Sequence, residues 1–212
     1  MMRVTVPFYA NKDETHCFQA CLRMMLKHFL PEREFTFREL DDISAKVEGL
    51  WTWPTAAALW LVDNGFEVRN VEAFNYREFE QEGGDYLLRH FGENVGRAQI
   101  DHGDIPQEVK LARFFNKKIV SEVRIPDIAD LRSCLDEGYI PCCNVNSCRL
   151  NGTDGYSGHF VIIVGYDEGS LFIHDPGLPG RQRLKVSNEV FEQAWAYPSS
   201  ASKNYLAVKR RS

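Results

Sequence analysis

Apolar residues recur at helical spacing through most of the first half of the chain. Such a repeat indicates an amphipathic helix, because one helical turn takes about 3.6 residues. Glycine or proline marks the end of several of these stretches. The pattern predicts helices over 17 to about 28–30, 35–47, 53–64 and most of 75–118, a short extended segment over 3–9, and a half-buried strand over 66–72, where apolar and polar residues alternate.

After about residue 119 the chain changes to short apolar runs separated by turn residues. The run from His159 to Tyr166 is apolar enough for a central strand, and the turn that follows predicts a hairpin with 171–175. Further strands are predicted over 119–123, 139–146, 183–186 and 205–208, and helices over 128–135 and 187–196. Helices thus dominate the first half and an antiparallel sheet the second, which predicts an α+β fold.

Cys17 lies where the first helix is predicted to begin. Thr15 or Glu14 precedes it and can cap the helix. Unpaired backbone N–H groups and the helix dipole stabilise negative charge at a helix N-terminus, so they favour the thiolate, which is the nucleophilic form of cysteine. A nucleophile of this kind needs a base elsewhere in the chain.

The predicted hairpin supplies a candidate base and a carboxylate. His159 begins its first strand and Asp175 ends its second, and both lie within a few residues of symmetry about the turn, so the aspartate can reach the imidazole. Asp175 would orient the ring, and His159 would take the proton of Cys17. His174 is an alternative base, but alternation places it on the opposite face of the strand from Asp175.

Composition and charge favour one ordinary globular domain. Hydrophobic residues make up 44% of the 212 residues and charged residues 26%. We expect a single domain over 1–212, with a helical lobe over about 1–118 and a sheet lobe over about 119–212. The net charge of −5 and the small basic cluster at the C-terminus argue against a nucleic-acid partner.

The chain carries no secretory signal pattern near its start and no apolar run long enough for a membrane span. We therefore expect a cytoplasmic protein without a membrane partner. In that compartment the six cysteines are expected to be reduced thiols rather than a disulfide framework.

Five segments carry a recognisable combined pattern: Val6-Pro-Phe-Tyr, Cys17-Phe-Gln-Ala-Cys-Leu-Arg-Met-Met, Gly158-His-Phe-Val-Ile-Ile-Val-Gly-Tyr-Asp, His174-Asp-Pro-Gly and Val190-Phe-Glu-Gln-Ala-Trp. Together they resemble the papain-like cysteine peptidase superfamily, in its stand-alone C39-like branch. The resemblance covers both ends of the chain well and residues 70–120 hardly at all.

The resemblance implies a papain-like fold with an N-terminal helical lobe packed on a sheet, and it implies roles for individual residues. Cys17 would attack a peptide carbonyl, His159 would be its base and Asp175 would orient that base, without a cofactor or metal. The family usually has a glutamine six positions before the cysteine as an oxyanion donor, and this chain has Asn11 there. Asparagine offers the same amide donor on a side chain one methylene shorter, and the Cys17 N–H would be the second donor.

The other cysteines have simpler interpretations. Cys134, Cys142 and Cys143 fit buried apolar positions, whereas Cys148 lies in a polar loop and is a candidate reactive thiol. Cys21 with His16 or His28 is a conceivable metal pair, but a compact set of four ligands is missing.

Among the aromatic and remaining histidine residues, Trp51, Trp53 and Trp60 either line a substrate groove or belong to the core. His90 and His102 are expected to be solvated surface residues.

These features predict a cysteine hydrolase that cleaves a peptide or amide bond through a thioester on Cys17. An acyltransferase or transpeptidase would share the mechanism up to the thioester and pass the acyl group to an amine. A non-catalytic binding module with a papain-like shape is the alternative of a different class. The sequence leaves the substrate, the pathway and the oligomeric state open.

Overall fold

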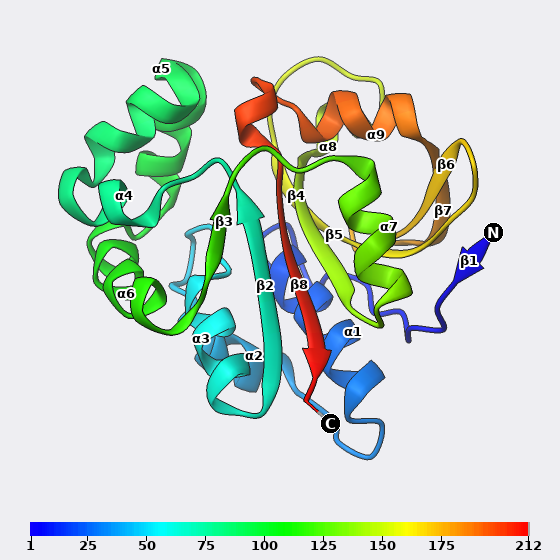
Figure 1. Ribbon diagram of the computed structural model, residues 1–212. Helices are drawn as coiled ribbons and strands as arrows, with labels where there is room; N and C mark the ends of the chain where they lie inside the picture. Colours follow the sequence, from blue (N-terminus) through cyan, green and yellow to red (C-terminus); the bar gives the residue numbers. More distant parts are fainter. Residues whose placement is uncertain (212) are drawn as a thin grey trace.

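A computed structural model of the protein describes residues 1–211 and has one central β-sheet with helices around it (Figure 1). The strands are β1 (Met2–Arg3), β2 (Phe66–Glu72), β3 (Ser121–Val123), β4 (Ile140–Asn146), β5 (Gly158–Tyr166), β6 (Ser170–Asp175), β7 (Arg181–Ser187) and β8 (Asn204–Arg210). The helices are α1 (Cys17–Phe29), α2 (Phe37–Ile43), α3 (Thr55–Asp63), α4 (Tyr76–Glu82), α5 (Gly84–His102), α6 (Ile105–Lys118), α7 (Ile128–Asp136), α8 (Ser147–Leu150) and α9 (Asn188–Trp195), with a 3₁₀ turn, η1 (Ser200–Ser202). The fold is α+β, as the sequence predicted.

The strand order in the sheet is β3-β2-β8-β4-β5-β6-β7, and β1 pairs with β5. Strand β2 lies in the first half of the sequence but pairs with β8 along its whole length (Figure 1). The prediction of an antiparallel sheet is wrong for one pair, because β2 and β3 are parallel. Helices α4 to α6 provide the long crossover that a parallel pair requires.

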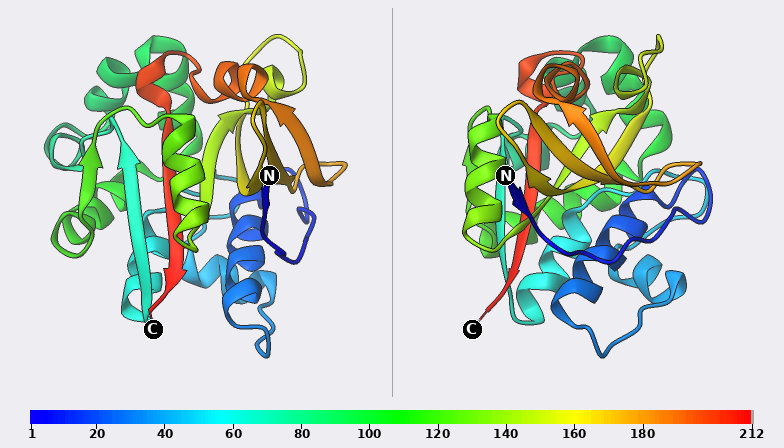
Figure 2. Two further views of the ribbon diagram at one scale, coloured as in Figure 1. Left: turned by 45° about the vertical axis from the view of Figure 1, so that its right-hand side comes forward. Right: turned by 90° about the vertical axis from the view of Figure 1, so that its right-hand side faces the viewer.

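The helices lie on both sides of the sheet, with α1 and α7 on opposite faces (Figure 2). The main core contains the apolar residues of α1 together with those of the central strands. A second cluster joins α3 to α6 and reaches the sheet at Leu206 of β8. The stretch 75–118, which carried little resemblance to a known family, thus forms a helical unit with its own apolar core beside the sheet. Within residues 1–211 no helix combines the length and the apolar character needed to cross a membrane.

Helix ends explain where the local predictions were too long or misplaced. Helix α1 begins at Cys17, but its cap residue is His16, whose side chain makes no capping bond. Thr15 does not cap the helix, since its hydroxyl is bonded to Asp13 at 2.9 Å. Helix α2 is shorter than predicted at both ends: Thr36 and Glu39 form a capping box at its start, and Ala45, just after its end, has a φ of +51°, outside the helical range.

Candidate active site

The loop before Cys17 is fixed by polar contacts that are partly buried. The Asp13 carboxylate accepts hydrogen bonds from the Thr15 N–H at 2.7 Å and from the Thr15 hydroxyl, and lies 2.7 Å from His16 Nδ1. The other ring nitrogen of His16 lies 3.3 Å from Asp41 of α2. His16 is only 7% exposed, so the residue directly before Cys17 is held between two carboxylates. This arrangement orients the first turn of α1, and with it the thiol.

His159 and Asp175 are in direct contact. His159 Nε2 lies 2.7 Å from Asp175 Oδ1, which leaves Nδ1 of the ring for another partner. The carboxylate also accepts the Gly177 N–H at 2.8 Å and the Arg181 Nε–H at 3.0 Å. Asp175 is only 2% exposed, so water cannot reach its carboxylate. These donors supply the hydrogen bonds that water would give to an exposed carboxylate.

The contacts of Asp175 also stabilise its charged form. Burial raises the pKa of Asp175, but the bonds from His159, Gly177 and Arg181 outweigh burial and lower its pKa to about 2. Arg181 was not singled out from the sequence, because its position in β7 shows nothing about the carboxylate that it meets. Its role is visible only from the β6–β7 pairing, in which Asp175 lies opposite Arg181.

Cys17 and His159 interact through their side chains. Burial raises the pKa of the Cys17 thiol, but the hydrogen bond and charge of His159, with the Phe160 and Phe18 N–H groups, outweigh burial and lower the pKa below its ordinary value. For His159, burial lowers the pKa, while Asp175 and the Cys17 thiolate raise it to about 10. The two shifts favour a thiolate paired with an imidazolium, a state that can attack a carbonyl carbon and then donate a proton.

Asn11 is tied to the same hairpin. Its backbone N–H donates to the carbonyl of Pro176, directly after Asp175, at 2.7 Å. Its side-chain oxygen accepts the Asp13 N–H at 3.3 Å, so the amide is oriented with its oxygen toward that loop. Asn11 is 9% exposed. The N–H of Cys17 belongs to the first turn of α1, where backbone donors have no partner within the helix.

His174, the alternative base, is engaged elsewhere. Its Nε2 lies 3.0 Å from the carbonyl of Val6, and its Nδ1 accepts the Arg183 N–H at 3.0 Å. The ring is fully buried, and burial lowers its pKa below the ordinary histidine value. His174 therefore fixes the N-terminal segment to the sheet.

The other cysteines and the candidate metal pair are also accounted for. Cys134, Cys142 and Cys143 are buried, as predicted. Cys148 is partly exposed, but it lies in the short helix α8 rather than in a loop, because the Asn146 side chain caps that helix. Cys21 is buried, and its thiol donates to the Phe160 carbonyl at 3.3 Å. Among the described residues no group of three or more His, Cys, Asp or Glu side chains is placed to hold a metal ion.

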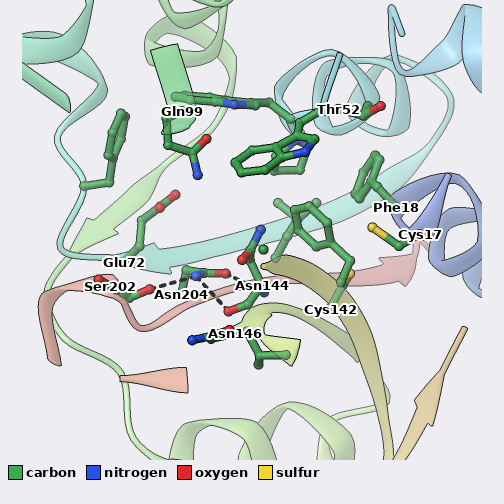
Figure 3. Close-up of a pocket in the computed structure, with 18 of the residues that line it drawn as sticks. Cys17, Phe18, Thr52, Glu72, Gln99, Cys142, Asn144, Asn146, Ser202 and Asn204 are labelled. Carbon is green, nitrogen blue, oxygen red and sulfur yellow. Dashed lines mark hydrogen bonds between the residues drawn. The ribbon is translucent and has the colours of Figure 1, made fainter. Parts of the chain in front are cut away.

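A cavity of about 160 Å³ opens beside Cys17 and extends across the sheet (Figure 3). Trp51 and Trp53 line it, whereas Trp60 does not and instead packs against Phe35. His102 is exposed and stacks on Trp51, but His90 is half-buried and packs on Tyr86, so the prediction of a solvated His90 is wrong.

Sequence reasoning missed the polar residues of the cavity floor. These are Asn70 and Glu72 of β2, Asn144 and Asn146 of β4, and Asn204 of β8. The available signal was an asparagine in each of the three strands, with Glu72 two residues after Asn70 in β2. Because the three strands are far apart in sequence, their pairing was needed to bring these residues together.

Comparisons with known proteins agree with this arrangement. The model of the peptidase C39-like family matches residues 3–203. No curated protein sequence matches the chain.

Three solved structures share the fold. The peptidase domain of Streptococcus ComA, a bifunctional ABC transporter involved in quorum sensing, is 15% identical with a TM-score of 0.51, over 96% of this chain and 97% of that one. A double glycine motif protease from an AMS/PCAT transporter, in complex with the leader peptide, is 13% identical with a TM-score of 0.51, over 99% and 94%. A putative C39-like peptidase from Bacillus anthracis is 18% identical with a TM-score of 0.53, over 100% and 99%. At these identities the similarity shows the papain-like C39 fold alone. Since the family model spans nearly the whole chain, the protein belongs to the peptidase C39-like family.

Proposed function

We propose that the protein is a cysteine hydrolase that cleaves a peptide or amide bond through a thioester on Cys17. The observation that carries this proposal is the continuous contact from Cys17 to His159 and from His159 to Asp175. Membership of a peptidase family supports the class of reaction.

In the first half of the reaction, the Cys17 thiolate adds to the carbonyl carbon and the carbonyl oxygen becomes an oxyanion. The N–H of Cys17 and the side-chain amide of Asn11 donate to that oxygen. When the C–N bond breaks, the His159 imidazolium gives its proton to the leaving amine, and the acyl group remains on sulfur as a thioester. Asp175 stabilises the imidazolium before this transfer and keeps the ring oriented after it.

In the second half, the neutral His159 takes a proton from water, which attacks the thioester carbonyl. Breakdown of this second intermediate releases a carboxylic acid and returns the thiolate–imidazolium pair. An amine in place of water would give acyl transfer by the same steps, and the site chemistry up to the thioester is shared.

The test is mass spectrometry of the protein after brief exposure to p-nitrophenyl acetate, an activated acyl donor. We expect an acetyl group on the peptide that contains Cys17, together with a burst of p-nitrophenol. Cys148→Ala serves as the matched control and should keep the adduct, because Cys148 is the other partly exposed thiol. If Cys17→Ala and the wild type trap the same species, the proposed acyl-enzyme is wrong. Adding a small amine during turnover distinguishes hydrolysis from acyl transfer by the product formed.

A further inference from the structure

The cavity beside Cys17 has a floor made by one row of side chains across four strands. Glu72 lies opposite Asn204 in the β2–β8 ladder, and Asn144 lies opposite Phe160 in the β4–β5 ladder. A hydrogen bond links these two pairs of residues into one row, since Asn204 Oδ1 accepts the Asn144 N–H at 2.9 Å. Adjacent strands are about 4.8 Å apart, so the row from Phe160 to Glu72 is about 14 Å long.

Cys17 and Glu72 occupy opposite ends of this cavity (Figure 3). The Phe160 N–H is a hydrogen-bond partner of the Cys17 sulfur, which places the thiol at the β5 end of the row. Glu72 is at the β2 end and projects into the cavity from the sheet (Figure 3). An occupant that reacts at Cys17 and reaches Glu72 must therefore be an extended chain, comparable in length to about four peptide residues.

Within residues 1–211, the cavity is lined by acidic side chains and by no basic ones. Among the described residues that line it there is no lysine, arginine or histidine; the acidic groups are the Cys17 thiol, which pairs with His159, Glu14, at the exposed rim, and Glu72. Glu72 accepts a hydrogen bond from Asn70 Nδ2 at 2.9 Å and takes part in no ion pair among residues 1–211. The nearby Arg124, whose N–H donates to the Glu72 carbonyl, has its guanidinium paired with Glu122 and Asp130.

Glu72 therefore has no cationic partner among the described residues, although its surroundings would stabilise a cation. Burial raises its pKa to about 7, and the neutral donors Asn70 and Tyr76 only partly oppose this. A buried carboxylate without a counter-ion is stabilised most strongly by a ligand that carries a positive charge. Aromatic side chains add to that preference, because the faces of such rings attract cations. The lining includes Trp51, Trp53, Phe74, Phe91, Tyr156 and Tyr197.

We propose that this cavity is the specificity pocket of the enzyme and that Glu72 binds the primary ammonium at the end of an extended substrate chain. The inference rests on the proposed function, since it takes Cys17 as the reacting atom. Asn70 is a positioning residue that holds the Glu72 carboxylate, also through its own contact with Ser121 at 3.1 Å. The ammonium belongs either to the N-terminus of a short peptide or to a lysine-type side chain, because both present the same group on an extended chain.

The test uses two matched pairs of chloromethyl ketones that alkylate Cys17. One pair is triglycyl chloromethyl ketone with a free N-terminus and its N-acetylated form, and the other is acetyl-lysyl and acetyl-norleucyl chloromethyl ketone. The rate of adduct formation on Cys17 is measured by mass spectrometry and compared with the rate for iodoacetamide. We expect the ammonium form of one pair to react about tenfold faster or more than its neutral match. The pair that shows the preference identifies the source of the ammonium.

Variants locate the preference. In Glu72→Gln the ammonium and neutral reagents should react at similar rates, whereas iodoacetamide should react as it does with the wild type. Glu67→Gln is the matched control on the same strand, outside the cavity, and should keep the preference. Equal rates within both pairs for the wild-type protein would overturn the inference without any variant. A preference lost in Glu14→Gln but kept in Glu72→Gln would place the cation at the rim and would also overturn it. Slow alkylation of wild-type Cys17 by iodoacetamide itself would instead count against the proposed function.

Discussion

His159 Nε2 contacts Asp175 Oδ1 at 2.7 Å, although the two residues are not opposite each other in the β5–β6 ladder. Ile162 pairs with His174, so the regular position opposite Asp175 is Val161, two residues away from His159. Diagonal neighbours of this kind are within reach of long side chains. The hairpin therefore places a histidine and a carboxylate in contact at its open end, while both residues remain within their strands.

The first prediction concerns the charge state of His159. In Asp175→Asn the main contact that raises the His159 pKa is lost, so this pKa should fall from about 10 by about 1–3 units. The measurement is an NMR titration of the imidazole ring in both proteins. A His159 that titrates at the same pH in the two proteins would contradict the stabilising role of Asp175. Asp136→Asn, on the distant helix α7, is the control.

The second prediction concerns Asn11. If its amide donates to the oxyanion, Asn11→Ala should slow acetylation of Cys17 by p-nitrophenyl acetate by about 10²-fold. Alkylation by iodoacetamide forms no oxyanion, so its rate should remain close to the wild-type rate. Equal slowing of both reactions would indicate that the substitution disturbs the loop rather than the oxyanion site, since the Asn11 backbone anchors that loop to Pro176.

The third prediction separates His174 from His159. His174→Ala removes two buried hydrogen bonds and should lower the free energy of unfolding by about 2–4 kcal/mol in urea titrations. The folded variant should still react with iodoacetamide at Cys17 as the wild type does, because His174 does not contact the thiol. His159→Ala should show the opposite behaviour, with a large loss of Cys17 reactivity. A similar loss of reactivity in both variants would return His174 to consideration as the base.

The fourth prediction is a pH dependence of stability that arises from Glu108. This side chain is 5% exposed, and burial raises its pKa from 4.5 to about 7. The folded protein therefore binds this proton more tightly than the unfolded chain does, so stability is lost as the pH rises from 4.5 through 7. Glu108→Gln should raise the free energy of unfolding by about 1–3 kcal/mol more at about pH 8 than at about pH 5. A gain of the same size at both pH values would show that ionisation of Glu108 is not its cause.

The local elements of the site could be predicted from the sequence because each depends on near neighbours. The start of a helix at Cys17 and the hairpin that carries His159 and Asp175 follow from apolar spacing and turn residues. The pairing of β2 with β8 could not be predicted, because periodicity identifies a strand but does not indicate which other strand it pairs with. For the same reason the row from Phe160 to Glu72 was not foreseen, because Glu72 of β2 and Asn204 of β8 are far apart in sequence from each other and from Asn144 and Phe160.

Some side-chain partners were also beyond sequence reasoning. His16 and His174 are both buried, and the role of each depends on the groups that face its ring nitrogens: carboxylates for His16, and a backbone carbonyl and a backbone N–H for His174. Thr15 is a good helix-capping residue, but the nearby Asp13 carboxylate binds its hydroxyl and places the cap at His16 instead. The local preference of Thr15 for helix capping was thus overridden by a contact that forms only in the folded loop.

The most direct test of the account is the pH dependence of Cys17 alkylation. The protein is treated with iodoacetamide across a pH series, and the adducts on Cys17 and on Cys148, the other partly exposed thiol, are mapped by mass spectrometry. Because His159 lowers the pKa of Cys17, Cys17 should react near pH ~6 much faster than both Cys148 and free cysteine, and His159→Ala should abolish the difference. A Cys17 that reacts no faster than free cysteine at that pH would contradict an activated nucleophile and favour a non-catalytic module with the same fold.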